Sequence, residues 1–297
     1  MRILLFGKYG QLGYELNRCL RPLGEVVAFD QEDLDLTESN QIPSLIREVQ
    51  PTIIINAAAY TAVDRAEEEE SLAYAMNAAA PGVMAEVANK LNAVLIHYST
   101  DYVFDGAKGE PYIEDDSPNP INVYGRSKLE GEHAVQDVGA SHIILRTSWL
   151  YSMRGPSFPN KVLRWAREQD VLRIVDDQIG SPTWARMLAE ATAFLLAVGK
   201  SFDKVWLEER TGIYHLAGLG SANRFEWAAQ ILKNDPRSAE HVYRDLQRAS
   251  SSEFPNQAQR PSFSALRCDK FASAFKLQIP PWEESLELAM GGDIRAF

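Results

Sequence analysis

Short apolar runs alternate with longer amphipathic stretches through the first half of the chain, and this alternation restricts the fold more than any other feature. The expected strands are Ile3–Phe6, Glu25–Phe29, Thr52–Asn56, Ala93–Tyr98 and His142–Thr147. The expected helices are Gln11–Leu20, Glu38–Val49, Glu68–Leu91 and Val123–Gln136. Strands separated by helices run parallel in a sheet that the helices cover. The pattern predicts an α/β protein with a Rossmann-type, doubly wound parallel sheet.

The second half of the chain is less regular, because Pro156, Pro159 and Pro182 interrupt it. We expect it to form a smaller, mixed α/β substrate-binding lobe. Two further apolar runs, Leu172–Val175 and Ile213–Leu216, are typical of strands that return to the main sheet. The predicted dinucleotide-binding domain is therefore residues 1–148, its sheet completed by parts of 172–217, and the predicted lobe is 149–171 and 218–297.

Composition and charge exclude several classes of protein. A formal net charge of −11 argues against a nucleic-acid-binding surface, which needs a basic face. Cys19 and Cys268 lie far apart without a CxxC motif, and the five histidines show no metal-ligand spacing, so we expect a reduced protein without a His/Cys metal site. No signal-peptide pattern precedes the first strand, and no apolar run approaches the roughly 20 residues of a membrane span. We expect a cytoplasmic protein with no membrane contact.

A glycine-rich segment, GKYGQLG at residues 7–13, lies between the first strand and its helix. Glycines permit a tight turn and let a pyrophosphate approach backbone N–H groups at the start of a helix. The predicted cofactor contacts here are Gly7, Gly10, Gln11, Leu12 and Gly13. A purely structural turn is the alternative.

Asp30 ends the second strand, where a carboxylate can accept hydrogen bonds from the adenosine ribose. This position favours NADH over NADPH unless Lys8 or Arg18 compensates a 2′-phosphate. Asp35 and Leu36 are predicted to bracket the adenine. After the third strand, the predicted cofactor contacts are Ala57, Ala58, Ala59, Tyr60 and Thr61; close packing of a helix on the strand is the other reading of the three alanines.

Tyr124 and Lys128 are four residues apart and therefore share one face of the predicted helix. A neighbouring ammonium stabilises a phenolate, so we predict that Lys128 lowers the pKa of Tyr124 and makes it a proton donor. Lys128 is also expected to bind the nicotinamide ribose. Thr100 follows the fourth strand and faces the ligand crevice, where its hydroxyl can polarise a carbonyl; Ser99 is the competing choice.

At this point the motifs resemble those of the dTDP-4-dehydrorhamnose reductases, a family of extended short-chain dehydrogenase/reductases. The resemblance rests on the glycine loop together with NAAAYTAVDRAE, STDYVFDG, NVYGRSKLEGE and RTSWLY. It is strong over residues 1–185 and thinner as far as Arg260-Pro261. Tyr60 stands where many relatives carry histidine, whereas DQIGSPT at 177–183 fits the family pattern.

The resemblance implies an activity and a set of residues. It implies that Thr100, Tyr124 and Lys128 form the catalytic set, that Thr61 contacts the cofactor and that Trp149 contacts the substrate. The implied reaction is NAD(P)H-dependent reduction of the C4 keto group of dTDP-4-dehydro-β-L-rhamnose to dTDP-β-L-rhamnose. Further predicted substrate contacts are Val103, Phe104 and Arg260, the last toward the diphosphate. A homodimer is expected, and Mg²⁺ at a dimer contact is possible by resemblance alone.

Two other functions stay open at this stage. A sugar-nucleotide epimerase or dehydratase uses the same Tyr/Lys pair, but dehydratases need a further acid and base, and no Glu follows Asp101 here. A non-catalytic NADP-binding regulatory subunit, like that of methionine adenosyltransferase, is the rival from another class. The intact set of Thr100, Tyr124 and Lys128 argues against it.

Overall fold

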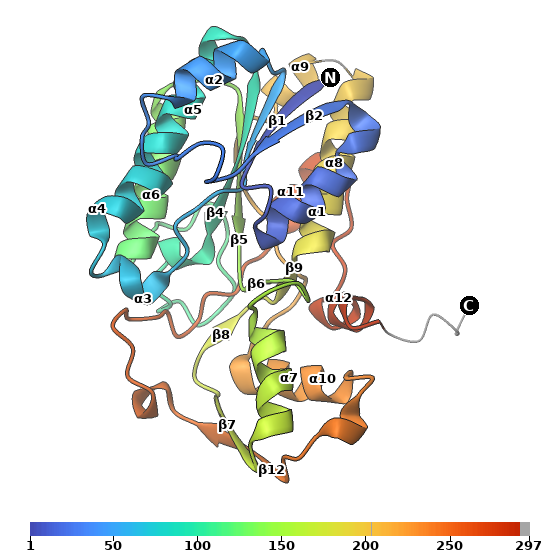
Figure 1. Cartoon of the computed structure of the whole chain (residues 1–297). Coiled ribbons are helices and arrows are strands. Elements are labelled where there is room, and N and C mark those ends of the chain that lie inside the picture. The colour runs from blue at the N-terminus through green and yellow to red at the C-terminus, as the bar shows by residue number, and fades with distance from the viewer. Residues whose placement is uncertain (203, 292–297) are drawn as a thin grey trace.

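A computed structural model describes residues 1–202 and 204–291 of the chain (Figure 1). Its strands are β1 (Arg2–Phe6), β2 (Glu25–Phe29), β3 (Ile53–Asn56), β4 (Val94–Thr100), β5 (His142–Thr147), β6 (Leu150–Tyr151), β7 (Val171–Val175), β8 (Ile179–Gly180), β9 (Thr183–Trp184), β10 (Gly212–His215), β11 (Ala222–Asn223) and β12 (Asp245–Ala249). Its α-helices are α1 (Gln11–Cys19), α2 (Ile42–Val49), α3 (Val63–Ala66), α4 (Glu70–Tyr74), α5 (Ala80–Lys90), α6 (Val123–Asp137), α7 (Phe158–Glu168), α8 (Ala185–Phe202), α9 (Lys204–Glu208), α10 (Arg224–Lys233), α11 (Asp269–Phe275) and α12 (Trp282–Ala289).

The main sheet has the strand order β10-β5-β4-β3-β1-β2, and its paired strands are parallel. The order reverses next to β1, because the chain moves from β1 outward to β2 and then crosses back to β3. This doubly wound α/β topology confirms the predicted fold class. The prediction that Ile213–Leu216 returns to the main sheet is also confirmed, since β10 pairs with β5.

Helices cover both faces of the sheet, with α1, α8 and α11 on one face and α2, α5 and α6 on the other (Figure 1). Alternate residues of β1 contribute to the two cores: Ile3 and Leu5 pack with the first group of helices, and Leu4 and Phe6 with the second. All four are at most 1% exposed. Burial on both faces explains why the strand is apolar without a break.

One predicted strand lies elsewhere. Residues 172–175 do not join the main sheet, because β7 pairs in parallel with β12 in a separate two-stranded sheet. In β7 the residues Leu172 and Ile174 are buried while Val171 and Arg173 are exposed, so the strand covers only one core. That core belongs to the second lobe, where the strand packs with α7, α10 and α12. The boundaries predicted for the two domains otherwise stay a prediction.

Two predicted helices differ in extent from those observed. Residues 38–41 form turns instead of the first turn of α2, which begins at Ile42 with Pro43 in its first turn, where proline's missing N–H costs nothing. The single helix expected over 68–91 is divided into α4, a π-helical turn at Ala75–Ala79, and α5. The π-helical turn carries Asn77, whose buried amide bonds to the backbone of Tyr60.

No helix within residues 1–202 and 204–291 combines the length and apolar character needed to cross a membrane.

Candidate active site

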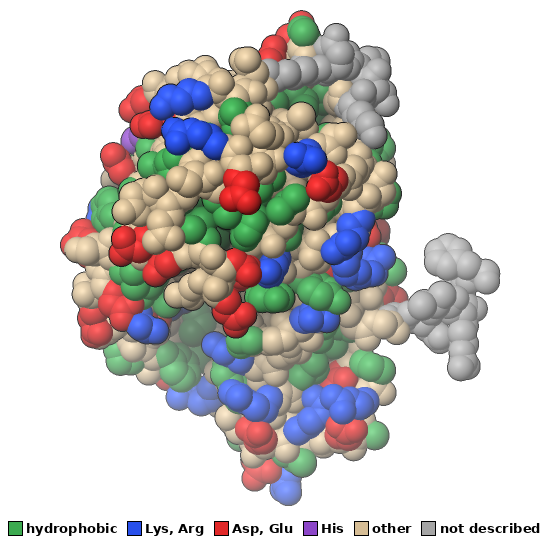
Figure 2. Space-filling model, turned by 45° about the horizontal axis from the view of Figure 1, so that its top comes forward, with side chains coloured by type: hydrophobic (Ala, Val, Ile, Leu, Met, Phe, Trp, Pro, Cys, Tyr) green, Lys and Arg blue, Asp and Glu red, His purple; other side chains and the backbone are tan. Residues whose placement is uncertain are grey.

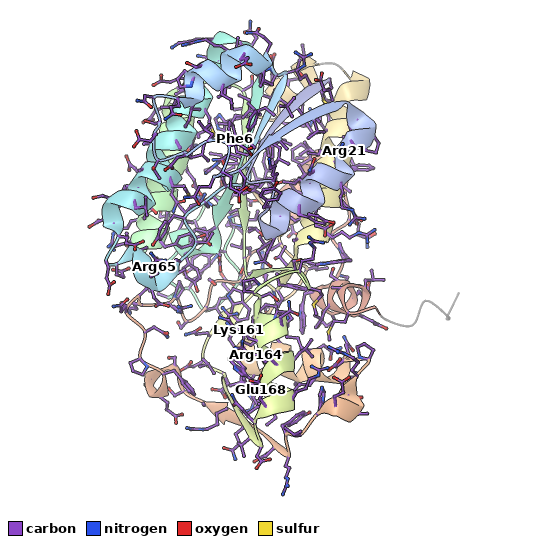
Figure 3. All side chains as sticks on the ribbon, viewed as in Figure 1. Phe6, Arg21, Arg65, Lys161, Arg164 and Glu168 are labelled. Atoms are coloured by element: carbon purple, nitrogen blue, oxygen red, sulfur yellow. The ribbon has the colours of Figure 1, made fainter. Side chains whose placement is uncertain are left out.

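A cavity of about 630 Å³ opens at the carboxyl ends of the main-sheet strands, between the sheet and the smaller lobe. Figure 3 shows Phe6, at the end of β1, and Lys161, on α7, on the two sides of this junction, and both line the cavity. This is the crevice in which doubly wound sheets bind their ligands. The predicted site residues that line it are Gly7, Gly10, Gln11, Leu12, Asp30, Leu36, Ala57, Ala58, Ala59, Thr61, Thr100, Tyr124, Lys128, Trp149 and Arg260.

The glycine loop forms one end of the cavity. Gly7 has a φ of 86°, and a Cβ there would lie 2.8 Å from the backbone nitrogen of Ala58. A Cβ on Gly13 would lie 1.8 Å from the carbonyl oxygen of Gly7, so this glycine allows α1 to pack on the loop and does not line the cavity. Gln11 does line it, and its buried Oε1 has no hydrogen-bond partner among the described residues.

Asp30 lies beside this loop at the end of β2. Its carboxylate accepts hydrogen bonds from the backbone N–H groups of Tyr9 and Gln31, both at 2.8 Å. Lys8 pairs with Asp33 at 2.6 Å rather than with Asp30. Asp35 is outside the cavity lining and accepts hydrogen bonds from Thr37, whereas its neighbour Leu36 is at the cavity wall.

The segment after β3 forms the floor of the same cavity. Ala57, Ala58, Ala59 and Thr61 line it, but Tyr60 does not. The Tyr60 hydroxyl donates a hydrogen bond to Glu69 instead, so its ring is directed toward the helices beside the site. Tyr60 was predicted to contact the cofactor, and the structure places its side chain away from the cavity.

Thr100, Tyr124 and Lys128 meet at the centre of the cavity. Thr100 ends β4, and Tyr124 and Lys128 lie one turn apart on α6, which begins at a cap where Asn122 accepts a hydrogen bond from Gly125. Burial raises the pKa of Tyr124 above its usual value, and a hydrogen bond with Thr100 opposes the rise. The phenol therefore stays protonated and is held next to the threonine hydroxyl.

The predicted lowering of the Tyr124 pKa by Lys128 is wrong for this arrangement. The Lys128 amine donates to the carbonyl oxygen of Tyr98 at 2.6 Å and lies 3.3 Å from Nε2 of His97. Burial lowers the pKa of Lys128 to about 8, against the effect of Glu132, which raises it. The amine thus interacts with β4 beneath the site, and burial dominates the acidity of the phenol.

Ser99, the alternative to Thr100, makes its hydrogen bond to a buried ion pair. Its hydroxyl donates to Glu132 at 2.5 Å, and Glu132 is bound by Arg146 through contacts of 2.9 and 2.6 Å. The Thr100 hydroxyl, by contrast, is shared among Tyr124, Asp101 and the N–H of Tyr102. Thr100 is therefore the better placed hydroxyl.

Trp149 lines the cavity on the side of the smaller lobe. It has a φ of 43°, a conformation uncommon for residues other than glycine and frequent at functional sites. Its ring stacks on Trp227 with centroids 5.4 Å apart, and the guanidinium of Arg224 lies 3.7 Å from its centroid. Arg260 also lines this side and pairs with Asp64 of α3 at 2.5 Å.

Val103 and Phe104 were predicted to contact the substrate, and the structure places both in the core instead. Each is 0% exposed, and neither lines the cavity. Phe104 stacks on Tyr112 with centroids 4.1 Å apart. Both residues come after the end of β4, where a short 3₁₀ turn at Asp101–Val103 carries the chain from the cavity into the core.

Several residues that the sequence did not single out complete the site. Lys161, Arg224, Phe158 and Trp227 line the cavity from α7 and α10. A second cavity of about 810 Å³ adjoins it through Phe158, Lys161, Arg224 and Arg260 and continues along β7. Figure 2 shows basic side chains on the part of the surface that the smaller lobe provides, although the whole chain is acidic. Nothing in the local sequence around Lys161 or Arg224 indicates this role, since tertiary packing brings them to the site.

Among residues 1–202 and 204–291, no group of three or more His, Cys, Asp or Glu side chains is arranged to hold a metal ion. The Mg²⁺ suggested by resemblance stays an untested prediction.

Comparison with known proteins gives a consistent result. A family model described as RmlD substrate binding domain matches residues 1–292. The dTDP-4-dehydrorhamnose reductases of Escherichia coli K12 and Sinorhizobium fredii are 40% and 41% identical to this chain, with 95% and 96% of it covered and 95% of each relative covered. The crystal structure of dTDP-4-dehydrorhamnose reductase from Bacillus anthracis in complex with NADP superposes with a TM-score of 0.87 at 36% identity, covering 97% of both chains. A Thermus thermophilus UDP-glucose 4-epimerase shares the fold alone, at 20% identity and a TM-score of 0.76.

Proposed function

Because the chain belongs to the dTDP-4-dehydrorhamnose reductase family, we propose that it reduces the C4 keto group of dTDP-4-dehydro-β-L-rhamnose to give dTDP-β-L-rhamnose, using NADPH or NADH. It is thus an oxidoreductase of dTDP-rhamnose biosynthesis. The observation that carries the proposal is one cavity that joins a glycine loop, the set of Thr100, Tyr124 and Lys128, and a cationic lobe.

The residues present fit a dinucleotide. Gly7 has no room for a Cβ beside Ala58, so the backbone of the loop packs closely on the segment after β3 at the cavity wall. Gln11 offers a buried acceptor, and Asp30 lies where an adenosine ribose would be bound. The cofactor contacts that we propose are Gly7, Gly10, Gln11, Leu12, Asp30, Leu36, Ala57, Ala58, Ala59, Thr61, Tyr124 and Lys128. When bound, NADPH or NADH supplies the hydride for the carbonyl carbon.

The chain's own groups handle the proton. Tyr124 keeps its proton because burial raises its pKa, and it donates that proton to the oxygen of the carbonyl as negative charge develops there. Thr100, bonded to the same phenol, orients the oxygen and stabilises the developing charge. Lys128, which lines the same cavity one helical turn from Tyr124, would hold the nicotinamide ribose of the bound cofactor.

The lobe provides the substrate contacts. We propose that Trp149 packs against the deoxysugar, since contacts with Trp227 and Arg224 hold its ring at the cavity wall. Three cations at the junction of the two cavities, Lys161, Arg224 and Arg260, would neutralise the diphosphate. The nucleoside would then extend into the second cavity. A homodimer and a cytoplasmic location complete the proposal.

A spectrophotometric assay tests this function. The 4-keto sugar is generated in the reaction mixture, and the absorbance of NADPH or NADH is recorded as the cofactor is oxidised. We expect turnover by the wild-type protein and a loss of at least about 100-fold in kcat for Tyr124→Phe, because one general acid typically contributes that much. Tyr243→Phe is the matched control, since Tyr243 lines neither cavity, and it should retain full activity. Tight cofactor binding without turnover would instead support the regulatory subunit, and epimerised sugar without net cofactor oxidation would support an epimerase.

A further inference from the structure

Three side chains beneath the cavity form a continuous line of hydrogen bonds that ends on the Lys128 amine. Asn56 ends β3, His97 lies on β4, and Lys128 lies on α6. Nδ2 of Asn56 is 3.1 Å from Nδ1 of His97, and Nε2 of His97 is 3.3 Å from Nζ of Lys128. All three residues are at most 1% exposed, so they satisfy one another rather than bulk water.

The direction of these hydrogen bonds is fixed at one end by the backbone. The N–H of Ala58 donates to Oδ1 of Asn56 at 3.1 Å, and a backbone N–H can only donate. The amide oxygen of Asn56 therefore faces Ala58, and its NH₂ group faces His97. Because that NH₂ group is also only a donor, Nδ1 of His97 must accept.

The tautomer of His97 follows. A neutral imidazole whose Nδ1 accepts carries its hydrogen on Nε2. Burial is the largest cause that keeps the pKa of His97 well below its usual value, and the ring is therefore taken as neutral, with one hydrogen. The Nε2–H bond of His97 is thus directed at Nζ of Lys128.

An ammonium group has three donors and no acceptor, whereas a neutral amine has a lone pair. Lys128 can accept from His97, and at the same time donate to the carbonyl oxygen of Tyr98 at 2.6 Å, only as a neutral amine. If Lys128 is protonated, its nitrogen can only donate. Two donors must then face each other at one of the hydrogen bonds that connect Ala58, Asn56, His97 and Lys128.

We propose that Asn56 and His97 are positioning residues that hold down the proton affinity of Lys128, beyond the effect of burial, by directing an N–H group at its nitrogen. The charge of Lys128 then changes near neutral pH, and so does its effect on Tyr124. The tautomer of His97 and the titration of Lys128 do not depend on the proposed function. Only the expected effect on turnover rests on it.

The other titratable groups around Lys128 do not replace this effect. They are Tyr124 and Glu132 on α6, Asp101 after β4, and Arg146 and His142 on β5. Glu132 favours the ammonium form, but it is held by two nitrogens of the Arg146 guanidinium, Nε and Nη2, and by Ser99. Its charge is therefore largely compensated where it stands.

Nuclear magnetic resonance of the full chain tests the inference without measuring activity. Long-range correlations in protein labelled with ¹⁵N-histidine report the tautomer, and ¹³C-lysine labelling reports the titration of Lys128; His97→Gln and Lys128→Met identify the two signals. We expect His97 as the Nε2–H tautomer and Lys128 titrating at least roughly two pH units below an ordinary lysine. An Nδ1–H tautomer in the wild-type protein would overturn the proposal by itself.

The variant Asn56→Asp should reverse the donor and acceptor roles in the hydrogen bonds between residue 56, His97 and Lys128. A carboxylate accepts from both Ala58 and Nδ1–H of His97, which leaves Nε2 to accept from the Lys128 ammonium. We expect the tautomer to switch and the Lys128 titration to rise by roughly one pH unit or more. Asn89→Asp, an equivalent change at an exposed position of α5, should alter neither signal. Unchanged signals in Asn56→Asp would contradict the proposal, and if that variant does not fold, the wild-type tautomer still decides.

Turnover separates this inference from the proposed function. In an active enzyme, the pH dependence of kcat/KM should move in Asn56→Asp by the same interval as the Lys128 titration. The predicted tautomer in a protein that never oxidises NADPH or NADH would refute the reductase function alone. An active enzyme with the opposite tautomer would refute this inference alone.

Discussion

Asp101 is a carboxyl group that folding removes from water and surrounds with hydroxyl groups. It is 2% exposed and accepts hydrogen bonds from Ser264, Ser148 and Thr100 at 2.5, 2.8 and 3.1 Å. Burial raises the pKa of Asp101 to about 6, and these hydrogen bonds limit the rise. The carboxyl group therefore links the end of β4 to Ser148 and Ser264, and its burial makes the stability of the protein depend on pH.

The sign of that dependence follows from proton binding. Between about pH 4 and pH 6 the folded protein holds a proton on Asp101 that the unfolded chain has released, so stability falls as pH rises through this interval. The loss amounts to about 3 kcal/mol. In Asp101→Asn this contribution is absent, so urea unfolding should show the variant gaining free energy of unfolding relative to wild type as pH rises.

Asp105 provides a control of opposite sign. The N–H of Ala107 and the side chain of Asn119 lower the pKa of Asp105, so its contribution to stability is lost as pH falls. The free energy of unfolding of Asp105→Asn should therefore rise relative to that of the wild-type protein as pH falls. Parallel pH profiles for wild type and Asp101→Asn would show that Asp101 is not a strained carboxyl group.

Local motifs predicted the residues that lie close together in the sequence. The glycine loop, Asp30 and the Tyr124/Lys128 pair are each recognisable within a few residues. The contact residues predicted from them line the cavity, with the exception of Gly13. The chemistry of Lys128 was not predictable, because its amine is governed by His97 and Tyr98 from another element. Exposure and partner identity are tertiary properties that spacing alone does not contain.

At the scale of elements, a buried ion pair joins α6 to the centre of the sheet. Glu132 is 0% exposed and Arg146, on β5, is 2% exposed. Their bidentate contact, with Ser99 of β4 as a third member, fixes the depth of the helix that carries Tyr124 and Lys128. A buried pair of this kind specifies position more than it adds stability.

Removal of one member should be costly. In Glu132→Gln the Arg146 charge remains buried without its carboxylate, so we expect the free energy of unfolding to fall by about 3 to 5 kcal/mol. The exposed pair of Arg186 and Glu190 on α8 is the control, and Glu190→Gln should change it by no more than about 1 kcal/mol. Equal effects of the two variants in denaturant titrations would mean that Glu132 does not anchor the helix.

Element boundaries show where periodicity is an incomplete guide. Residues 38–41 were predicted to begin a helix, yet Asp35 accepts hydrogen bonds from the N–H and hydroxyl of Thr37, and the chain turns before α2 begins at Ile42. A strand was predicted at 172–175 and β7 is found there, but its partner β12 lies some seventy residues later in the chain. Which sheet a strand joins depends on such distant pairing.

At the scale of the whole molecule, the two lobes meet around a line of cations. Arg224 comes from α10, Lys161 from α7, and Arg260 from a late segment that pairs with Asp64 of α3. The same segment is tied to α6, because Asn122 donates to the carbonyl oxygen of Gln259 at 2.8 Å. Three cations of an acidic chain are thus brought together at the junction of its two cavities.

Arg224→Gln should separate substrate binding from cofactor binding. Loss of a charge-assisted contact to a diphosphate predicts a rise in KM for the nucleotide sugar of roughly 10-fold to 100-fold. The dissociation constant of the cofactor, measured by fluorescence, should stay within about twofold, because Arg224 lies on the lobe side. Arg164→Gln, on the exposed face of α7, serves as the control and should leave both constants unchanged. A loss of cofactor affinity as large as the rise in KM would show that Arg224 contacts the cofactor and not the substrate alone.

The order of strands in the main sheet has a consequence during synthesis on the ribosome. β5 emerges well before β10, its outer neighbour, because the first part of the lobe and all of α8 are translated in between. At roughly 5–20 residues per second, the nascent chain displays an unpaired apolar strand edge for several seconds. Molecular chaperones that shield such edges are therefore expected to engage this protein while it is still attached to the ribosome.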